Sequence, residues 1–286
     1  MYKVNELNIL YEDNHVLVVL KPAGVPSQPD RSSAPDMLGL LKRHLVIRDR
    51  KKGNAWLGLV HRLDRPTSGL MVFAKTSKAA SRMSRSFRSR DVEKYYVAKV
   101  RGVPDQESGV LRDYLSACEI EGRVRLLTSA NASDAMSSSK EKKCDTSARY
   151  TFQDYRGEGN HLKDAKIAEL TWAAISSSKS DLSYETLLFI KLLTGRRHQI
   201  RVQLAERGFP ILGDRRYGYN DERDLSVPTL ALHACGLVFP HPVQKTTMAF
   251  FADPSINSSF DHEDVNVFNR YINSLLERGK LATPTL

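Results

Sequence analysis

The chain has 286 residues, of which 41% are hydrophobic and 27% are charged. This composition excludes an intrinsically disordered chain, which would be poorer in apolar residues. The length suits one large or two small domains, and we expect a single domain over residues 1–286. The formal net charge of +10 predicts a polyanionic partner, with RNA, DNA or an anionic membrane surface as the candidates.

Cysteine usage and hydropathy indicate where such a protein works. Cys118, Cys144 and Cys235 are widely spaced and form no CxxC pair, which disfavours a disulfide framework or a cysteine-rich zinc site. The first twenty residues do not form a signal peptide, and no window approaches the ~20 apolar residues that span a bilayer. We therefore expect a cytoplasmic protein, a monomer, with no membrane partner.

The predicted elements follow one another without a regular alternation of strands and helices. Strands are predicted at residues 8–20 (two, around a turn), 57–60, 70–73, 94–100, 186–193, 230–239 and 247–251, and helices at 37–45, 76–90, 197–207 and 261–278. This order favours an α+β fold, with a mixed, largely antiparallel sheet surrounded by helices and loops, over a doubly wound parallel sheet. Residues 129–148, rich in Ser, Lys and Asp, predict a mobile surface loop.

A strongly basic stretch follows residue 77. Eight basic residues lie between Lys78 and Arg101, against only two acidic ones, Asp91 and Glu93. A solvated helix face would usually mix the two signs, so the imbalance favours phosphate contacts. We assign RNA binding to three side chains of the predicted helix: Arg82, Arg85 and Arg88.

Asp64 is the leading candidate for chemistry. It lies in a polar loop between two predicted strands, and the charges of Arg62 and Arg65 favour its ionised form. A fixed carboxylate can attack an electrophilic carbon or remove a proton. Composition alone favours the ordinary alternative, an aspartate that caps a turn or makes a surface ion pair. Without a GxGxxG or GxxxxGK[ST] pattern, we expect no nucleotide cofactor.

Several ordered motifs resemble the RluA family of RNA pseudouridine synthases. Residues 60–69 (VHRLDRPTSG) are similar to the signature loop of that family. Further similar segments are residues 21–24 (KPAG), 94–98 (KYYVA), 194–201 (TGRRHQIR), 210–214 (PILGD) and 232–234 (LHA). The resemblance covers roughly residues 8–252 and is specific, because all the segments occur in the family's order.

The resemblance implies an isomerase that needs no cofactor, ATP or metal. A uridine in RNA is detached at its C1′–N1 bond, and the uracil turns and rejoins through C5. Asp64 corresponds to the essential carboxylate, whether it attacks C1′ or removes a ribose proton. Tyr96 corresponds to the tyrosine that stacks on the base, and its oxygen is a candidate for C5 proton removal. Arg196 corresponds to the arginine that pairs with the carboxylate.

Other residues are assigned to RNA on the same resemblance. A stem uridine must leave the base stack, and Arg62 corresponds to an arginine that fills the vacated space. Each of these roles has an alternative. Arg62 could contact a phosphate instead, Tyr96 could be a tyrosine packed in the core, and Arg196 could bind a phosphate. The remaining RNA-binding predictions are His61, Arg65, Arg197, His198 and Arg201. We expect no metal site, since the spacing of His61, His198, His233 and His241 matches no zinc pattern.

The target and two competing functions stay open at this level. Many family members carry an additional N-terminal S4 domain, but here the catalytic pattern begins near Asn8, so we expect the catalytic domain itself to hold the RNA. Ribosomal RNA is favoured weakly over transfer RNA. The alternatives are a non-catalytic RNA-binding module that retains the family fold and a nucleoside or glycoside hydrolase, which would usually need a second carboxylate.

Overall fold

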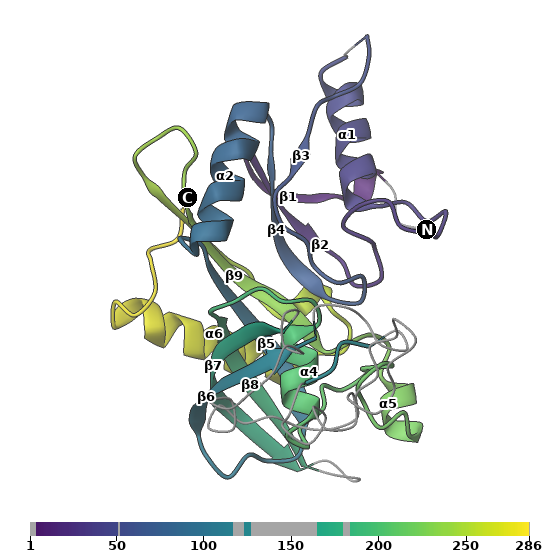
Figure 1. The fold of residues 1–286 in the computed structure, drawn as a ribbon, viewed down its shortest axis with the longest axis vertical. Helices are drawn as coiled ribbons and strands as arrows, with labels where there is room; N and C mark the ends of the chain where they lie inside the picture. Colours follow the sequence, from purple (N-terminus) through teal and green to yellow (C-terminus); the bar gives the residue numbers. More distant parts are fainter. Residues whose placement is uncertain (1–3, 51, 117–122, 127–164, 180–183, 286) are drawn as a thin grey trace, which may run out of the picture. The chain divides into compact units, whose positions relative to one another are not determined.

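The computed structural model describes residues 4–50, 52–116, 123–126, 165–179 and 184–285 (Figure 1). The predicted loop at residues 129–148 lies outside this part of the chain. The contacts divide the chain into two compact units, with Met1–Val97 and Pro228–Leu286 in unit 1 and Ala98–Val227 in unit 2. The single domain over residues 1–286 stays a prediction.

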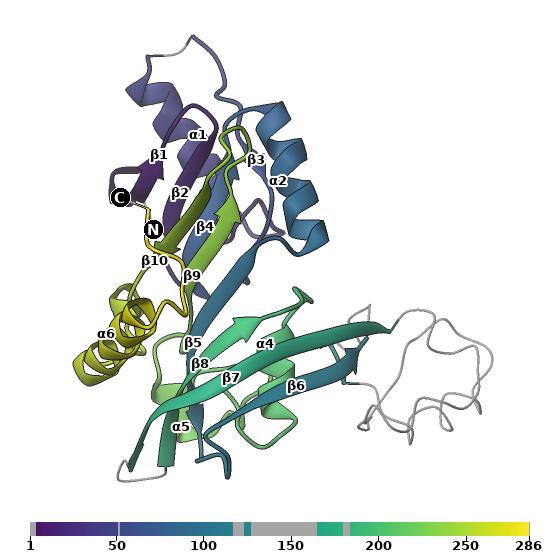
Figure 2. The same cartoon turned by 90° about the vertical axis from the view of Figure 1, so that its left-hand side faces the viewer.

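Unit 1 is built around a mixed sheet. Its strands are β1 (Asn8–Glu12), β2 (Val16–Lys21), β3 (Gly58–Leu59), β4 (Ser68–Ala74), the first part of β5 (Glu93–Arg101), β9 (Leu232–Pro240) and β10 (Thr247–Phe251). The order is β1-β2-β4-β9-β5, with β3 paired to β4 and β10 to β9. β4 and β9 are parallel, whereas β1–β2, β2–β4, β3–β4 and β9–β10 are antiparallel (Figure 2).

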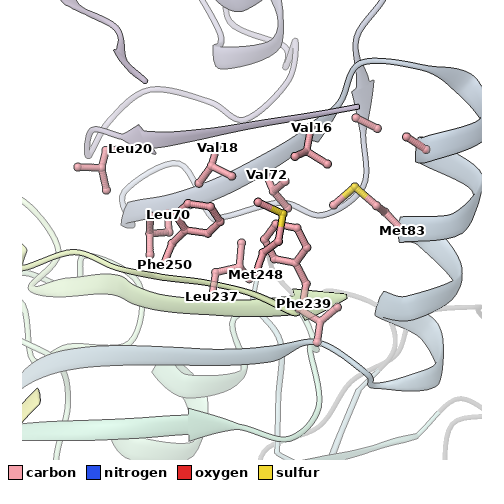
Figure 3. Packing of buried hydrophobic residues seen from close by; sticks show 13 residues of the cluster. Val16, Val18, Leu20, Leu70, Val72, Met83, Leu237, Phe239, Met248 and Phe250 are labelled. Atoms are coloured by element: carbon pink, nitrogen blue, oxygen red, sulfur yellow. The ribbon is translucent and has the colours of Figure 1, made fainter. Parts of the chain in front are cut away.

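The core of unit 1 follows from the period of two along these strands. Val16, Val18 and Leu20 on β2 point to the same side, and Leu70 and Val72 on β4 join them. Figure 3 shows this cluster together with side chains from β9, β10 and helix α2, namely Leu237, Phe239, Met248, Phe250 and Met83. The core holds β4 rigidly, and the polar loop of interest ends at the first residue of this strand.

Helices of unit 1 begin at polar caps that the sequence provides. The helical elements are η1 (Val4–Glu6), α1 (Met37–Arg48), α2 (Ser77–Ser89), η4 (Pro254–Ile256) and α6 (His262–Glu277). The Thr76 side chain accepts a hydrogen bond from the backbone N–H of Ala79 at 3.1 Å, as a helix N-cap does. α2 lies beside β4 (Figure 1) and buries Ala79 and Met83, leaving its basic side chains outside.

Unit 2 continues β5 into a second set of strands. β5 is followed in the sheet by β8 (Tyr184–Leu192), β7 (Lys166–Lys179) and β6 (Ser108–Leu115), and β6–β7 and β7–β8 are antiparallel (Figure 2). The described helices are α4 (Gln199–Ala205) and α5 (Glu222–Ser226). The predicted α+β class with a mixed, largely antiparallel sheet is confirmed.

Candidate active site

The polar loop that carries Asp64 joins β3 to β4 in unit 1. Asp64 is partly exposed, between the buried Leu63 and the exposed Arg65. The carbonyl oxygen of Asp64 accepts a hydrogen bond from the backbone N–H of Thr67 at 3.0 Å, which closes a tight turn. The loop thus presents a carboxylate near solvent from a backbone that is held by its own hydrogen bonds.

A fully buried lysine supports the loop from the other side. The Nζ atom of Lys21 donates to the carbonyl oxygens of Pro22, Val25 and Arg65, at distances of 2.9, 2.7 and 3.0 Å. Burial lowers the pKa of Lys21 to about 7; the negative charge of Asp64 opposes this shift and the positive charge of Arg65 adds to it. Lys21 therefore lies within electrostatic reach of Asp64, a role the KPAG motif did not reveal.

Tyr96, on β5, belongs to the same neighbourhood of unit 1. The side chain is buried, and this burial raises the pKa of the phenol well above its usual value, with a further contribution from the Asp64 carboxylate. Tyr95 has different surroundings, because its hydroxyl donates to Glu93 at 2.6 Å and its ring lies 6.1 Å from that of Phe251. Asp64 therefore lies within electrostatic reach of Tyr96, whose side chain is a neutral phenol.

The end of the loop is fixed against β9 by a buried polar network. The Ser68 hydroxyl lies 2.9 Å from Nδ1 of His233 and accepts from Nδ2 of Asn257 at 3.0 Å. Burial lowers the pKa of His233 to about 4, so the imidazole is neutral near pH 7. Gly69 has a φ of +119° and lies directly against the backbone of Ala234, where only a residue without Cβ fits.

The ring of His61 makes contacts inside the protein. Its Nε2 atom accepts a hydrogen bond from the backbone N–H of Val72 at 3.0 Å, and its ring stacks on Phe87 with centroids 4.8 Å apart. Burial, together with the positive charge of Lys94, lowers the pKa of His61 to about 3. A neutral ring occupied in this way offers no cation to a phosphate, which differs from the sequence-based prediction.

In unit 2, the TGRRHQIR segment is organised around a buried glutamine. Oε1 of Gln199 accepts from the Thr194 hydroxyl at 2.7 Å and from the backbone N–H of Arg196 at 3.0 Å. Nε of Arg196 donates to the carbonyl oxygen of Ile167 at 2.9 Å. The guanidinium of Arg196 is therefore oriented, while its pairing with Asp64 stays a prediction.

Two predicted RNA contacts in unit 2 are engaged within the protein. Arg201 forms a two-point ion pair with Asp214, with Nε···Oδ2 at 2.7 Å and NH2···Oδ1 at 2.6 Å, and its side chain is only 6% exposed. His198 is buried, with Nδ1 at 2.8 Å from the Tyr217 hydroxyl. Both residues organise this segment, and a phosphate contact by Arg201 has no support from this geometry. Arg197 is exposed.

The remaining basic predictions lie at the surface of unit 1. Among the described residues, Arg62 is exposed and makes no hydrogen bond or ion pair. Nε of Arg65 donates to the carbonyl oxygen of Gly24 at 3.0 Å, and its NH1 lies 3.5 Å from an oxygen of Asp30. Arg82 donates to the carbonyl oxygen of Pro242 at 2.7 Å. The other two arginines assigned to RNA on α2 are exposed: Arg85 and Arg88.

The described ranges of the chain hold no cluster of metal ligands and no membrane-spanning helix. No three His, Cys, Asp or Glu side chains in these ranges gather closely enough to hold a metal ion. Within the same ranges, no helix combines the length and the apolar character needed to cross a membrane.

Comparisons with known proteins identify the family of the chain. A family model described as RNA pseudouridylate synthase matches residues 15–206. The chain is 32% identical to the dual-specificity RNA pseudouridine synthase RluA of Escherichia coli strain K12 over 246 residues, which cover 86% of this chain and 92% of that protein. It is 29% identical to an uncharacterized RNA pseudouridine synthase of Aquifex aeolicus strain VF5, over 85% of this chain and 68% of that one.

Solved structures show the same fold. The human RNA pseudouridylate synthase domain containing 1 protein has a TM-score of 0.67 and 21% identity, covering all of this chain and 99% of that one. The human domain containing 4 protein has a TM-score of 0.64 and 22% identity, covering 97% and 95%. The family match and the identity to RluA show that the chain belongs to the RNA pseudouridylate synthase family and is an RNA pseudouridine synthase of the RluA type.

Proposed function

We propose that the protein converts specific uridines of structured RNA to pseudouridine with Asp64 as the essential carboxylate. The observation that carries this proposal is the placement of Asp64, which is partly exposed on a turn of fixed backbone and close enough to Tyr96 to influence its phenol. A negative oxygen beside the ribose is what either cleavage route needs, by attack on C1′ or by removal of a ribose proton. Structured ribosomal RNA is the first substrate to test and transfer RNA the second. The Escherichia coli relative is named as a dual-specificity enzyme, and a relative from Buchnera aphidicola, 29% identical over 281 residues, is named as a ribosomal large subunit pseudouridine synthase.

Arg62 is suited to the step that precedes chemistry. A uridine within a stem has to leave the stack, at a cost of a few kcal/mol, before its ribose can reach the Asp64 carboxylate. Arg62 is exposed, lies two residues from Asp64 and has no partner among the described residues, so its planar guanidinium is available to occupy the vacated space. Arg62→Ala is expected to lower turnover more on a stem uridine than on the same uridine in a single strand, whereas a pure phosphate contact would weaken both equally.

Tyr96 is proposed to support the released base through its ring. The raised pKa keeps the phenol protonated at neutral pH, so the flat apolar face rather than a phenolate is the resident feature. Tyr96→Phe keeps the ring, and Tyr96→Leu removes it. Retained turnover in the first variant and lost turnover in the second identify stacking; loss in both assigns a role to the oxygen, including removal of the C5 proton.

The remaining proposed contacts lie on both units. On the family resemblance, Arg196 is the candidate partner of the Asp64 carboxylate, and a planar guanidinium can bind a carboxylate at two points. Exposed arginines supply sequence-independent attraction to phosphates. This set consists of Arg65, Arg82, Arg85, Arg88 and Arg197.

Tritium release from RNA that contains 5-tritiated uridine tests the proposal, with Asp64→Asn as the variant and Asp91→Asn as a matched exposed control. We expect no turnover with Asp64→Asn, unchanged RNA binding, and ordinary turnover with Asp91→Asn. Turnover that survives in Asp64→Asn would exclude Asp64 as the catalyst. RNA binding without pseudouridine in the wild-type protein would support the binding-module alternative, and release of free uracil would support a hydrolase.

A further inference from the structure

A buried serine far from Asp64 in sequence holds the backbone directly before it. Ser27 lies between the KPAG motif and α1 and is 5% exposed. Its hydroxyl donates to the carbonyl oxygen of Leu63 at 2.7 Å and accepts from the backbone N–H of the same residue at 3.1 Å. The Ser27 side chain thus bonds to both the N–H and the carbonyl group of Leu63. Leu63 lies in the loop between β3 and β4, where neither group pairs with a neighbouring strand.

This contact fixes one of the two peptide planes that flank Asp64. The carbonyl of Leu63 belongs to the peptide unit that ends at the nitrogen of Asp64, and peptide units are rigid planes. The plane on the other side is held by the hydrogen bond from the backbone N–H of Thr67 to the Asp64 carbonyl oxygen, at 3.0 Å. With both planes held, the φ and ψ angles of Asp64 are set, and the carboxylate position then depends on the side-chain torsions alone.

The next residue is held as well, by the same segment of chain. The carbonyl oxygen of Arg65 accepts from Nζ of Lys21 at 3.0 Å and from the backbone N–H of Gly24 at 2.8 Å. Residues 21–27 therefore hold the loop on either side of Asp64. Among these holding groups, the hydroxyl of Ser27 is uncharged, so its removal changes the geometry of the loop without changing the charge near the carboxylate.

We propose that Ser27 is a positioning residue, which sets the place of the Asp64 carboxylate by fixing the Leu63–Asp64 peptide unit. This inference rests on the proposed role of Asp64. A reacting oxygen has to lie about 3–3.5 Å from its target atom, and a misplacement of about 1 Å costs on the order of 100-fold in rate. A rotation of the peptide unit moves the Cα–Cβ bond of Asp64 directly, so the effect falls on turnover rather than on RNA binding.

Ser27→Ala tests the inference, since it removes the hydroxyl and leaves the charge of the site intact. We expect kcat to fall about 10- to 100-fold while KM for RNA changes less than about threefold. Ser259→Ala is the matched control in unit 1, because the Ser259 hydroxyl makes the same pair of bonds to Thr229, donating to its carbonyl at 2.7 Å and accepting from its N–H at 3.1 Å. The control is expected to change kcat less than about threefold.

A second variant covers the case in which Ser27→Ala does not fold. Ser27→Cys nearly keeps the volume but offers a much weaker donor and acceptor, so an intermediate kcat is expected. A kcat in folded Ser27→Ala or Ser27→Cys that matches the Ser259→Ala control overturns the inference. Asp64→Asn in the same assay separates the two claims: an active Asp64→Asn variant overturns the proposed function, whereas an inactive one beside an unimpaired Ser27→Ala overturns only the positioning role.

Discussion

Gly69→Ala is the sharpest test of how the catalytic loop is joined to β4. Gly69 has a φ of +119° and pairs with Ala234 in the short parallel contact between β4 and β9. A Cβ at this position would lie 2.5 Å from the nitrogen and 2.8 Å from the carbonyl carbon of Ala234. Both atoms belong to backbone, so no flexible side chain can move aside.

The expected cost adds three contributions. The positive φ costs an alanine about 1–3 kcal/mol. Ordinary contacts begin at 3.4 Å, so the two strands have to separate by roughly 1 Å, an overpacking that costs about 1–3 kcal/mol. Hydrogen bonds of the strand pair are weakened as well, at about 0.5–1.5 kcal/mol each. With one hydrogen bond weakened, the free energy of unfolding should therefore fall by roughly 2.5–7.5 kcal/mol, with a loss of turnover because the loop moves with the strand.

Urea unfolding measures this change, and Gly279→Ala is the matched control. Gly279 has a φ of +63°, and no neighbouring atom lies within 4 Å of the place that a Cβ would take, so it carries the backbone penalty without the collision. We expect the control to lose about 1–2 kcal/mol. A Gly69→Ala variant within about 1 kcal/mol of Gly279→Ala would refute the steric argument.

Three further outcomes follow from the buried and exposed charges. Burial lowers the pKa of His233 to about 4, so below about pH 6.5 the unfolded chain takes up a proton that the folded protein excludes. As the pH falls from about 6.5 to about 4, the free energy of unfolding should therefore fall by up to about 1.4 kcal/mol per pH unit. His233→Asn should flatten this dependence, as urea unfolding at several pH values can measure. Asp214→Asn leaves the buried Arg201 charge uncompensated and should cost about 3–5 kcal/mol of unfolding free energy; a loss below about 1 kcal/mol would contradict a structural ion pair. Arg88→Gln should reduce the slope of log K against log salt for RNA binding by about 0.7–0.9 without changing kcat, as titrations at several salt concentrations can show.

Local signals in the sequence predicted most of the elements that carry the site. Thr76 before an apolar i, i+3, i+4 pattern predicted α2 close to its observed bounds, Ser77–Ser89. The alternating KYYVAKV segment predicted β5, Glu93–Arg101. β6 and β7 were not predicted from their own residues, because the pairing of a strand depends on partners far away in sequence.

The roles of individual side chains were harder to predict than the elements. The motif placed His61 in the polar loop, but its contact with Val72 and Phe87 depends on how β4 and α2 pack. Arg201 looked like part of a basic surface, although Asp214, thirteen residues later, neutralises it in the interior. Ser27 gives no local signal at all, since a serine after a proline usually indicates only a turn.

Because side chains in β5 alternate between two faces, the loss or gain of one residue in this strand disturbs the site more than a replacement does. Adjacent tyrosines in a strand face opposite sides. Here Tyr95 donates a hydrogen bond to Glu93 and packs against Phe251, whereas the charge of Asp64 contributes to the raised pKa of Tyr96. Deleting one residue just ahead of the strand would exchange the two faces and present the wrong ring to the carboxylate. Natural variation in this segment should therefore consist of replacements, and insertions or deletions should be confined to the connections beyond its ends.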